Sequence, residues 1–459
     1  MFINDTIAAI STPHGNGGIG IIKISGDKAF EIAEKIFTGK KPFMDVKPNT
    51  ISFGRIIDPV NSETVDEVLV SKMKAPHTFT REDIVEINCH GGFVVIKRIL
   101  EIILKNGARL AEPGEFTKRA FLNGRIDLSQ AEAVIDVINS KTEESSRAAV
   151  LQLEGKLSSR LKIVRDKLLD LITHIEVTVD YPEHDIEEIT GREVHDSIKG
   201  IKQSLYELTE GFDKGRILRE GLNAVIVGRP NVGKSSLLNF IAGKNRAIVT
   251  DIPGTTRDII EEYVNIGGIP VRLIDTAGIR ETEDLIEQIG VKRAQSELEN
   301  ADLVILMIDA GQGITDEDKG LIEKAGSKKS IIIINKTDLT YEAELDKLES
   351  LIASNRIVRM SVKNGTGLES LEERLKGLFI KGDIRQNEEV LLTNIRHKNL
   401  IDNAIISIDA AISAFEAGMP LDCVTIDIRN AAEYLGQITG ESVTEDVMHR
   451  IFSRFCIGK

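Results

Sequence analysis

Apolar residues change their spacing along the 459-residue chain, and each spacing predicts a different kind of structure. Up to about residue 111, short apolar runs at 19–24 and 67–73 have the character of strands. A helical pattern at 93–104 lies between a Gly-Gly turn and an Asn-Gly turn. Short strands mixed with helices in this way predict a compact α/β domain.

From residue 128 the apolar positions recur at steps of three and four, as on one face of a long helix. The same period returns after residue 382. Each stripe could belong to an independent core helix, or the two could pack together. The first stripe consists of Leu153, Leu157, Leu161, Val164, Leu168, Leu171 and Ile175, and the second of Ile401, Ile405, Ile408, Ile412 and Phe415.

Between these stripes, at about 221–379, strand and helix patterns alternate. This alternation predicts a mostly parallel sheet wound by helices on both sides. The economical interpretation is an α/β domain inserted into a helical domain whose two halves fold together. The expected strands lie at 224–227, 258–267, 271–275, 303–309, 331–335 and 357–361. The predicted domains are 1–118 (N-terminal α/β), 119–215 (first helical half), 216–380 (the insert) and 381–459 (second helical half).

Composition is that of a globular protein, with 41% hydrophobic and 28% charged residues. We expect no signal peptide, because the N-terminus lacks a basic region and a long apolar core. Apolar stretches stay far below membrane-spanning length, so we expect no membrane partner. Cys89, Cys423 and Cys456 form no zinc spacing and indicate reduced thiols in the cytoplasm.

The formal net charge of −14 argues against indiscriminate binding to nucleic acid, although local basic faces are compatible with it. Two basic groups stand out, and solvated helix faces are the more economical interpretation of each. The first contains Lys97, Arg98, Lys105, Arg109, Lys118, Arg119 and Arg125; the second contains Lys156, Arg160, Lys162, Arg165 and Lys167.

Three motifs in the inserted segment together predict a guanine-nucleotide site. Residues 228–235 read Gly-Arg-Pro-Asn-Val-Gly-Lys-Ser and follow an expected strand, so their backbone N–H groups can cradle phosphate oxygens. Residues 275–278 read Asp-Thr-Ala-Gly, and residues 335–338 read Asn-Lys-Thr-Asp. The Asp338 carboxylate can accept both the N1–H and the exocyclic amine of guanine, and Asn335 assists. Residues 361–363 resemble a weaker base-contact motif.

The predicted GTP contacts cover the phosphate loop, a switch segment and the base motif. Ser235 and Thr256 are expected to ligate Mg²⁺ through their hydroxyls, with Asp275 reaching the ion through water. The contacts are Asn231, Val232, Gly233, Lys234, Ser235, Ser236, Thr250, Asp251, Ile252, Pro253, Gly254, Thr255, Thr256, Asp275, Thr276, Ala277, Gly278, Asn335, Lys336 and Asp338.

Hydrolysis requires an unusual arrangement, because the position that carries a water-orienting Gln in Ras-like enzymes is Ile279. Arg257 is a possible arginine finger. We instead expect K⁺ to supply the missing charge, bound by Asn231, Thr250, Ile252 and Thr255. For orienting the water Glu287 is our candidate, and Glu281, Glu283 and Asp284 compete with it.

Two further stretches carry a resemblance to a known family. Residues 113–125 read Pro-Gly-Glu-Phe-Thr-Lys-Arg-Ala-Phe-Leu-Asn-Gly-Arg, residues 127–133 read Asp-Leu-Ser-Gln-Ala-Glu-Ala, and the chain ends in Phe-Cys-Ile-Gly-Lys at 455–459. With the inserted GTPase segment, these closely resemble the MnmE (TrmE) family of tRNA-modification GTPases, over essentially the whole chain.

The resemblance implies a Ras-like P-loop G domain inserted into a helical domain, behind an N-terminal domain that binds folate and forms a homodimer. It implies a flavoprotein partner, MnmG, which carries FAD, and modification of C5 of wobble uridine 34 in certain tRNAs. It implies 5-formyltetrahydrofolate or methylenetetrahydrofolate as one-carbon ligand. It further implies K⁺-dependent pairing of G domains and Glu287 as the residue that orients the water.

For folate, the resemblance points to Lys23, Glu86, Arg125 and Lys459. Lys23 departs from the arginine usual in the family, which keeps the charge but loses bidentate geometry. Cys456 could handle the one-carbon unit or only pack beside the pocket. Two alternatives stay open: a ribosome-assembly switch of the Era or Der type, and a folate-dependent enzyme whose G domain is only structural.

Overall fold

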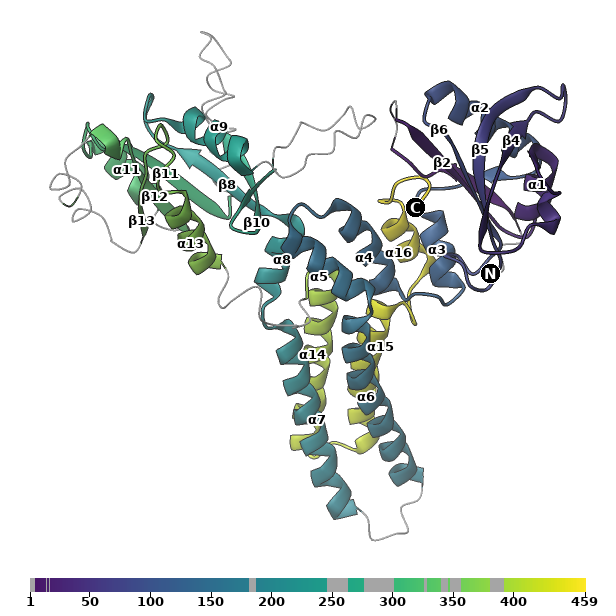
Figure 1. Ribbon diagram of the computed structural model, residues 1–459. Helices are drawn as coiled ribbons and strands as arrows, with labels where there is room; N and C mark the ends of the chain where they lie inside the picture. The colour runs from purple at the N-terminus through teal and green to yellow at the C-terminus, as the bar shows by residue number, and fades with distance from the viewer. Residues whose placement is uncertain are drawn as a thin grey trace, which may run out of the picture.

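The protein is described from a computed structural model that covers residues 5–13, 15, 17–180, 187–245, 263–275, 301–325, 328–339, 346, 356–379 and 392–459. Figure 1 shows an N-terminal sheet domain, an elongated helical domain and a second sheet domain; the two sheet domains lie on opposite sides of one end of the helical domain. None of the described helices has the length and apolarity that crossing a membrane requires.

The N-terminal domain contains a seven-stranded sheet in which only the β1–β7 pair is parallel. Its strand order is β3 (Phe37–Gly39), β4 (Thr50–Ile57), β5 (Thr64–Met73), β6 (Ile84–His90), β2 (Ile19–Ser25), β1 (Ile7–Ile10) and β7 (Arg109–Leu110). The strands and helix predicted at 19–24, 67–73 and 93–104 correspond to β2, β5 and α2 (Phe93–Lys105).

Alternation along these strands gives the sheet two different faces. One face packs Ile22, Val70 and Ile87 against α1 (Ala29–Ile36) and α2. On the opposite face, Phe53 and Leu69 are paired across β4 and β5, and they are 65% and 46% exposed. The sheet therefore keeps an apolar area open to solvent on the side away from its covering helices.

The helical domain is built from both sides of the insertion. The first side supplies α3 (Glu115–Leu122), α4 (Leu128–Asn139), α5 (Glu143–Leu153), α6 (Lys156–Asp180), α7 (Glu187–Thr209) and α8 (Phe212–Glu220). The second side supplies α14 (Ile395–Glu416), α15 (Leu421–Thr439) and α16 (Glu445–Phe452). The two predicted stripes meet in one core, where Leu168 and Ile198 join Ile408 and Leu435.

One residue of the first stripe was assigned wrongly. Leu153 is the last residue of α5 and lies outside the long helix, which begins at Lys156. Gly155 separates the two helices with φ of +81°, a left-handed conformation that favours glycine. The helix therefore breaks at Gly155, although the spacing of apolar residues continues across the break.

A buried charged cluster ties the helices on the two sides of the insertion together. Glu132 of α4 bonds Arg396 and His397 of α14, with closest distances of 2.9 Å and 2.5 Å. Burial alone would raise the pKa of Glu132, but His397 and Arg396 outweigh it and lower that pKa to about 2. The carboxylate is therefore charged, and its hydrogen-bond partners come from the other half of the domain.

The inserted domain contains a six-stranded sheet that is parallel except for the pairing of β9 with β10. Its strand order is β13 (Ile357–Arg359), β12 (Ser330–Asn335), β11 (Leu303–Asp309), β8 (Leu222–Val227), β10 (Ile269–Asp275) and β9 (Tyr263–Ile266). The described helices are α9 (Lys234–Asn245), α11 (Asp316–Ala325) and α13 (Leu368–Phe379). Apolar cores lie on both faces, as the alternating pattern predicted.

The end of the chain returns to the N-terminal domain (Figure 1). Phe452 and Phe455 pack against Leu128, and the Gly458 carbonyl accepts a hydrogen bond of 3.2 Å from the Ser11 hydroxyl. Gly458 has φ of +92°, and a Cβ there would lie 2.2 Å from the Ile10 carbonyl oxygen. Only glycine fits this approach, which places the terminal Lys459 beside the first sheet.

Candidate functional site

The phosphate loop lies between β8 and α9, and its shape depends on two glycines. Gly228 has φ of +152° and Gly233 has φ of +106°. A Cβ on Gly233 would lie 2.4 Å from the side-chain nitrogen of Asn335. The loop turns sharply at these points, so that it can present its backbone N–H groups at the start of α9.

Three of the predicted phosphate and cation ligands, Asn231, Lys234 and Ser235, lie in the described part of the chain, at this loop. The Lys234 ammonium donates to the Gly228 and Arg229 carbonyls at 2.5 Å and 2.9 Å, so it lies over the loop. Asn231 has φ of +64°, and its side chain and that of Ser235 are exposed. Exposed amide and hydroxyl oxygens at a helix N-terminus suit hard cations that accompany phosphates.

The base motif is attached directly to the phosphate loop. Asn335, which is buried, donates from its side chain to the Val232 carbonyl at 2.8 Å and accepts from the Val362 N–H at 3.2 Å. Lys336 donates to the Asn231 carbonyl at 2.9 Å. The Asn335 side chain therefore connects three loops, while its predicted contact with the base stays a prediction.

Asp338 is exposed at the end of this motif, in the short helix η3 (Thr337–Leu339). The Ser361 hydroxyl donates to one of its carboxylate oxygens at 2.6 Å. This hydrogen bond lowers the pKa of Asp338, so the group is a charged acceptor at neutral pH. A charged, oriented carboxylate is what the two adjacent donors of guanine require.

Other predicted residues lie outside the described part of the chain. Asp275 ends β10, but its side chain is outside that part too. The residues outside it are Thr250, Asp251, Ile252, Pro253, Gly254, Thr255, Thr256, Arg257, Thr276, Ala277, Gly278, Ile279, Glu281, Glu283, Asp284 and Glu287.

A second candidate site lies on the N-terminal sheet. Lys23 of β2 and Glu86 of β6 are direct neighbours in register and form an ion pair of 3.6 Å. The Lys23 ammonium lies 5.5 Å from the ring centres of both Phe79 and Phe116. The Arg125 guanidinium lies 4.7 Å from the centre of the Phe79 ring.

Lys459 completes the charge pattern of this site. Burial lowers the pKa of Lys23; Glu86 raises it in part, and the nearby positive charge of Lys459 lowers it further. Three predicted cations, one carboxylate and two aromatic rings thus converge from separate segments of the chain. Such a set can hold a flat heterocycle with donor groups at one edge and an anionic tail. Cys456, three residues before Lys459, is exposed.

The rings of Phe79 and Phe116 were not recognised as part of the site from the sequence. Phe116 stands in the Pro-Gly-Glu-Phe block, but nothing in a single aromatic residue shows which lysine it will contact. Phe79 lies in an irregular connection between β5 and β6. The packing of Phe79 and Phe116 with Ile7 and Ala9 of β1 is what brings them to Lys23.

Part of the first basic group is internal. Arg119 is 1% exposed and bonds Asp5, Glu82 and Glu115, and Arg109 bonds Asp5 and Glu115 as well. These acids come from three different segments, so the sequence did not reveal the pairing. Arg109 and Arg119 therefore link segments of the N-terminal domain, and the buried Arg119 is not accessible to nucleic acid.

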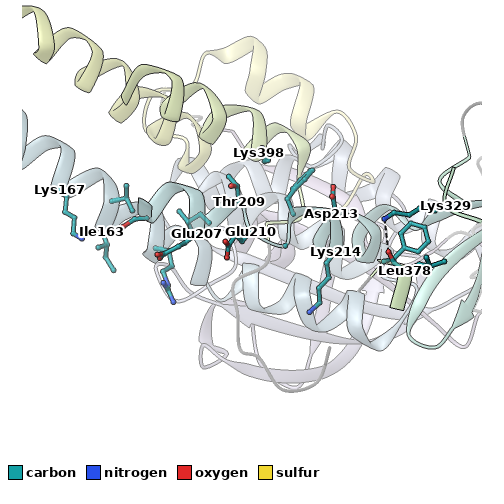
Figure 2. Close-up of a pocket in the computed structure, with 17 residues that line it drawn as sticks. Ile163, Lys167, Glu207, Thr209, Glu210, Asp213, Lys214, Lys329, Leu378 and Lys398 are labelled. Atoms are coloured by element: carbon teal, nitrogen blue, oxygen red, sulfur yellow. Dashed lines mark hydrogen bonds between the residues drawn. The ribbon is translucent and has the colours of Figure 1, made fainter. Parts of the chain in front are cut away.

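Part of the second basic group lines a cavity of about 1070 Å³ between the helical and inserted domains (Figure 2). The Lys329 ammonium donates to the Leu378 carbonyl at 3.2 Å across one end of it. The walls carry both cations and carboxylates, so the cavity has no uniform charge that would select a nucleic-acid backbone. The charged lining residues are Arg160, Lys167, Lys214, Lys329, Lys398, Glu207, Glu210 and Asp213.

Comparison with known proteins gives matches along the whole chain. Residues 6–125 match the family model described as GTP-binding protein TrmE N-terminus, and residues 128–456 match that of the MnmE helical domain. The tRNA modification GTPase MnmE of Acetivibrio thermocellus is 64% identical over 100% of both chains. Those of Alkaliphilus metalliredigens and Clostridioides difficile are 52% and 50% identical, each over 100% of both chains.

Proposed function

The chain belongs to the MnmE family of tRNA modification GTPases, and from this premise we propose that GTP hydrolysis here drives modification of C5 of wobble uridine 34. Acting with the flavoprotein MnmG and its FAD, the protein would install an aminomethyl or carboxymethylaminomethyl group on certain tRNAs. A tRNA substrate and this partner would place the protein in the cytoplasm. The observation that carries the nucleotide part is the attachment of Asn335 and Lys336 to adjacent carbonyls of the phosphate loop.

We propose that Asp338 selects guanine, with Asn335 assisting, and that Ser235, Thr256 and Asp275 serve Mg²⁺. The exposed Ser235 at the start of α9 supports the Mg²⁺ assignment. For K⁺ we propose Asn231, Thr250, Ile252 and Thr255, supported by the exposed amide of Asn231 in the phosphate loop. A cation bound there would supply positive charge beside the phosphates. Glu287 would orient the attacking water.

We propose a homodimer formed through the N-terminal sheets. Its support is the uncovered face, where Phe53, Leu69 and the neighbouring Ile51 expose apolar side chains that a second copy could bury. We propose further that Lys23, Glu86, Arg125 and Lys459 bind 5-formyltetrahydrofolate or methylenetetrahydrofolate. The converging cations suit the glutamyl tail, and Glu86 suits the donor edge of the pterin.

Helix α8 supports a mechanical connection between hydrolysis and modification. Arg216 bonds Asp302 of the inserted domain at 3.2 Å, and one turn later Arg219 bonds Asp136 of α4 at 2.9 Å. The next strand, β8, leads directly into the phosphate loop. Movement of the inserted domain would therefore be felt by α4 and, through Glu132, by the remainder of the helical domain.

Nucleoside analysis of tRNA tests this function. Cells that lack the protein should lose the C5 group on uridine 34, wild-type protein should restore it, and Asp338→Asn should not. Retained modification with Asp338→Asn would break the coupling between GTP and modification. GTP turnover measured in K⁺ and in Na⁺ at matched ionic strength tests the cation separately, since equal rates would refute the K⁺ assignment alone.

No specific observation favours the ribosome-assembly alternative, because both segments outside the inserted domain match tRNA-modification family models. An inserted domain that is only structural would be identified by tRNA modification that continues without GTP turnover.

A further inference from the structure

A buried carboxylate stands behind the base motif and was not among the predicted site residues. Asp309 is the last residue of β11 and is 4% exposed. It is paired in register with Asn335, the last residue of β12. Both strands end at the same edge of the sheet, so Asp309 lies directly beside the first residue of the guanine-selecting motif.

Each oxygen of the Asp309 carboxylate has a partner. One accepts a hydrogen bond of 2.9 Å from the Gly311 N–H, which fixes the carboxylate within its own turn. The other forms an ion pair of 2.6 Å with the Lys336 ammonium. Because the carboxylate is held from one side, it provides a fixed negative charge against which the longer, flexible lysine side chain is oriented.

The same ammonium donates to the Asn231 carbonyl of the phosphate loop at 2.9 Å. Asn231 and Lys336 both have φ of +64°, a left-handed conformation that asparagine adopts readily and that is less common for lysine. The lysine thus joins two left-handed backbone positions, one in the phosphate loop and one in the base motif. Asn335 adds a second connection, from its side chain to the Val232 carbonyl.

We propose that Asp309 is a positioning residue for GTP binding and hydrolysis. It holds the Lys336 ammonium against the Asn231 carbonyl, and so sets the distance between the phosphate loop and the residues that select guanine. Without this charge, the Lys336 ammonium would leave the Asn231 carbonyl and bind water instead. Part of the free energy of nucleotide binding would then be used to order the loop, and the affinity would fall. The inference rests on guanine-nucleotide binding at this site and not on the proposed role of K⁺.

The test is a double-mutant cycle between Asp309→Asn and Lys336→Met. Asparagine keeps the shape of the side chain and can still accept from the Gly311 N–H, but it removes the charge that orients the lysine. Asp309→Asn should weaken GDP binding, measured by calorimetry, by about tenfold, as expected when a charged hydrogen-bond partner is lost. In the Lys336→Met background the same substitution should have almost no further effect, because its target is gone.

Two additional measurements separate positioning from folding. The thermal midpoint of each variant is recorded without nucleotide, and Asp316→Asn serves as the matched control, since Asp316 is exposed and bonds Lys319 on the surface. The control should bind GDP as wild type does. A lowered midpoint of Asp309→Asn with unchanged GDP affinity would overturn the proposal, and so would additive losses in the double variant.

If Asp309→Asn does not fold, Asp309→Glu is measured in its place, alone and with Lys336→Met, and additivity there would equally overturn the proposal. The K⁺ assignment is judged independently from wild-type turnover in K⁺ and Na⁺. A protein indifferent to K⁺ that still shows the non-additive loss of GDP affinity would retain Asp309 in this role. If the wild-type protein binds no GDP, both the role of Asp309 and the proposed guanine-nucleotide site are wrong.

Discussion

The guanine-nucleotide site and the candidate folate pocket are built in opposite ways. In the inserted domain, the described site residues belong to two short segments, 231–236 and 335–338, and their contacts are largely to backbone carbonyls. At the N-terminal site, Lys23, Glu86, Arg125 and Lys459 come from four separate segments and are related through their side-chain charges and neighbouring aromatic rings. A site made by a bent backbone needs fixed residues at fixed spacing, whereas a site made by converging charges depends on how distant segments pack.

The largest expected effect is a loss of stability of the N-terminal domain on substitution of Arg119. Arg119→Met leaves the carboxylates of Asp5, Glu82 and Glu115 without the buried charge that they share. We expect a loss of roughly 3–5 kcal/mol in the free energy of unfolding of this domain. Calorimetric unfolding measures it, and titration with 5-formyltetrahydrofolate and with GDP shows which site is affected.

Arg98→Met is the matched control, because Arg98 is itself exposed, unlike Arg119, and pairs with the partly buried Asp58 and the exposed Glu63. We expect it to cost at most about 1 kcal/mol. Folate binding should fail in Arg119→Met while GDP binding persists. Equal losses at the two sites would show that they do not assemble independently.

The stability of the wild-type protein at low pH should depend on the same ion pairs, those of Glu115 with Arg109 and Arg119. Burial alone would raise the pKa of Glu115, but hydrogen bonds and charge from Arg109 and Arg119 outweigh it and hold that pKa below its ordinary value. A carboxyl group with a lowered folded-state pKa stabilises the fold above its ordinary pKa, and this contribution is lost as the pH falls through the lowered value. We therefore expect the thermal midpoint of the wild-type protein to fall as the pH is lowered below 5. In Arg119→Met, measured over the same pH series, this fall should be smaller.

At the guanine site, Asp338→Asn should cause the next largest effect. An amide presents a donor where guanine also presents donors, so affinity for GTP should fall by roughly 10²-fold or more. Xanthosine triphosphate, which carries a carbonyl in place of the exocyclic amine, should bind better than GTP. Competition between the two nucleotides measures this, with Asp316→Asn as control. Unchanged discrimination would remove Asp338 from base selection.

A smaller effect is expected at the folate pocket, where several charges share one ligand. Lys23→Met should weaken binding of 5-formyltetrahydrofolate by about tenfold, because one of three cations is lost. Lys23→Arg should bind at least as well as wild type, and Lys35→Met on the exposed side of α1 should have no effect. Calorimetric titration decides. Identical affinities for methionine and arginine at position 23 would exclude this lysine from the pocket.

The smallest effect is expected for Ser361→Ala. Its hydroxyl orients Asp338, and residues 361–363 are expected to contact the base only weakly, so GDP affinity should fall by roughly two- to fivefold. Ser413→Ala, which removes an exposed helical hydroxyl, is the control. A loss as large as that of Asp338→Asn would mean that the serine, and not the carboxylate alone, carries base selection.

Much of the architecture could be predicted because the period of apolar residues differs between helices and strands. The mostly parallel sheet of the inserted domain, the two helical stripes and the α/β character of the N-terminal segment all follow from that period. Leu153 shows its limit. Gly155 breaks the helix without disturbing the apolar spacing, so periodicity alone placed Leu153 in the wrong helix.

Basic clusters show a second limit. Arg109 and Arg119 were grouped with exposed cations because they are close in sequence, yet they are paired within the fold. Asp309 was overlooked for the same reason, since an acid at the end of an apolar strand has no visible partner. Charge partners across a sheet or between domains are a property of packing, and one sequence does not encode them as a spacing.

By itself, the sequence determined the chemistry that depends on local backbone shape: glycines that allow a phosphate loop, and polar residues that follow strand ends. Only the tertiary structure decided which distant charges meet, as in the cluster at Arg119, in the pairing of Asp309 with Lys336, and in the return of Lys459 to the first sheet. The physical reason is range. Backbone conformation is set by neighbours in the chain, whereas a Coulomb partner can come from any segment that folding brings within a few ångströms.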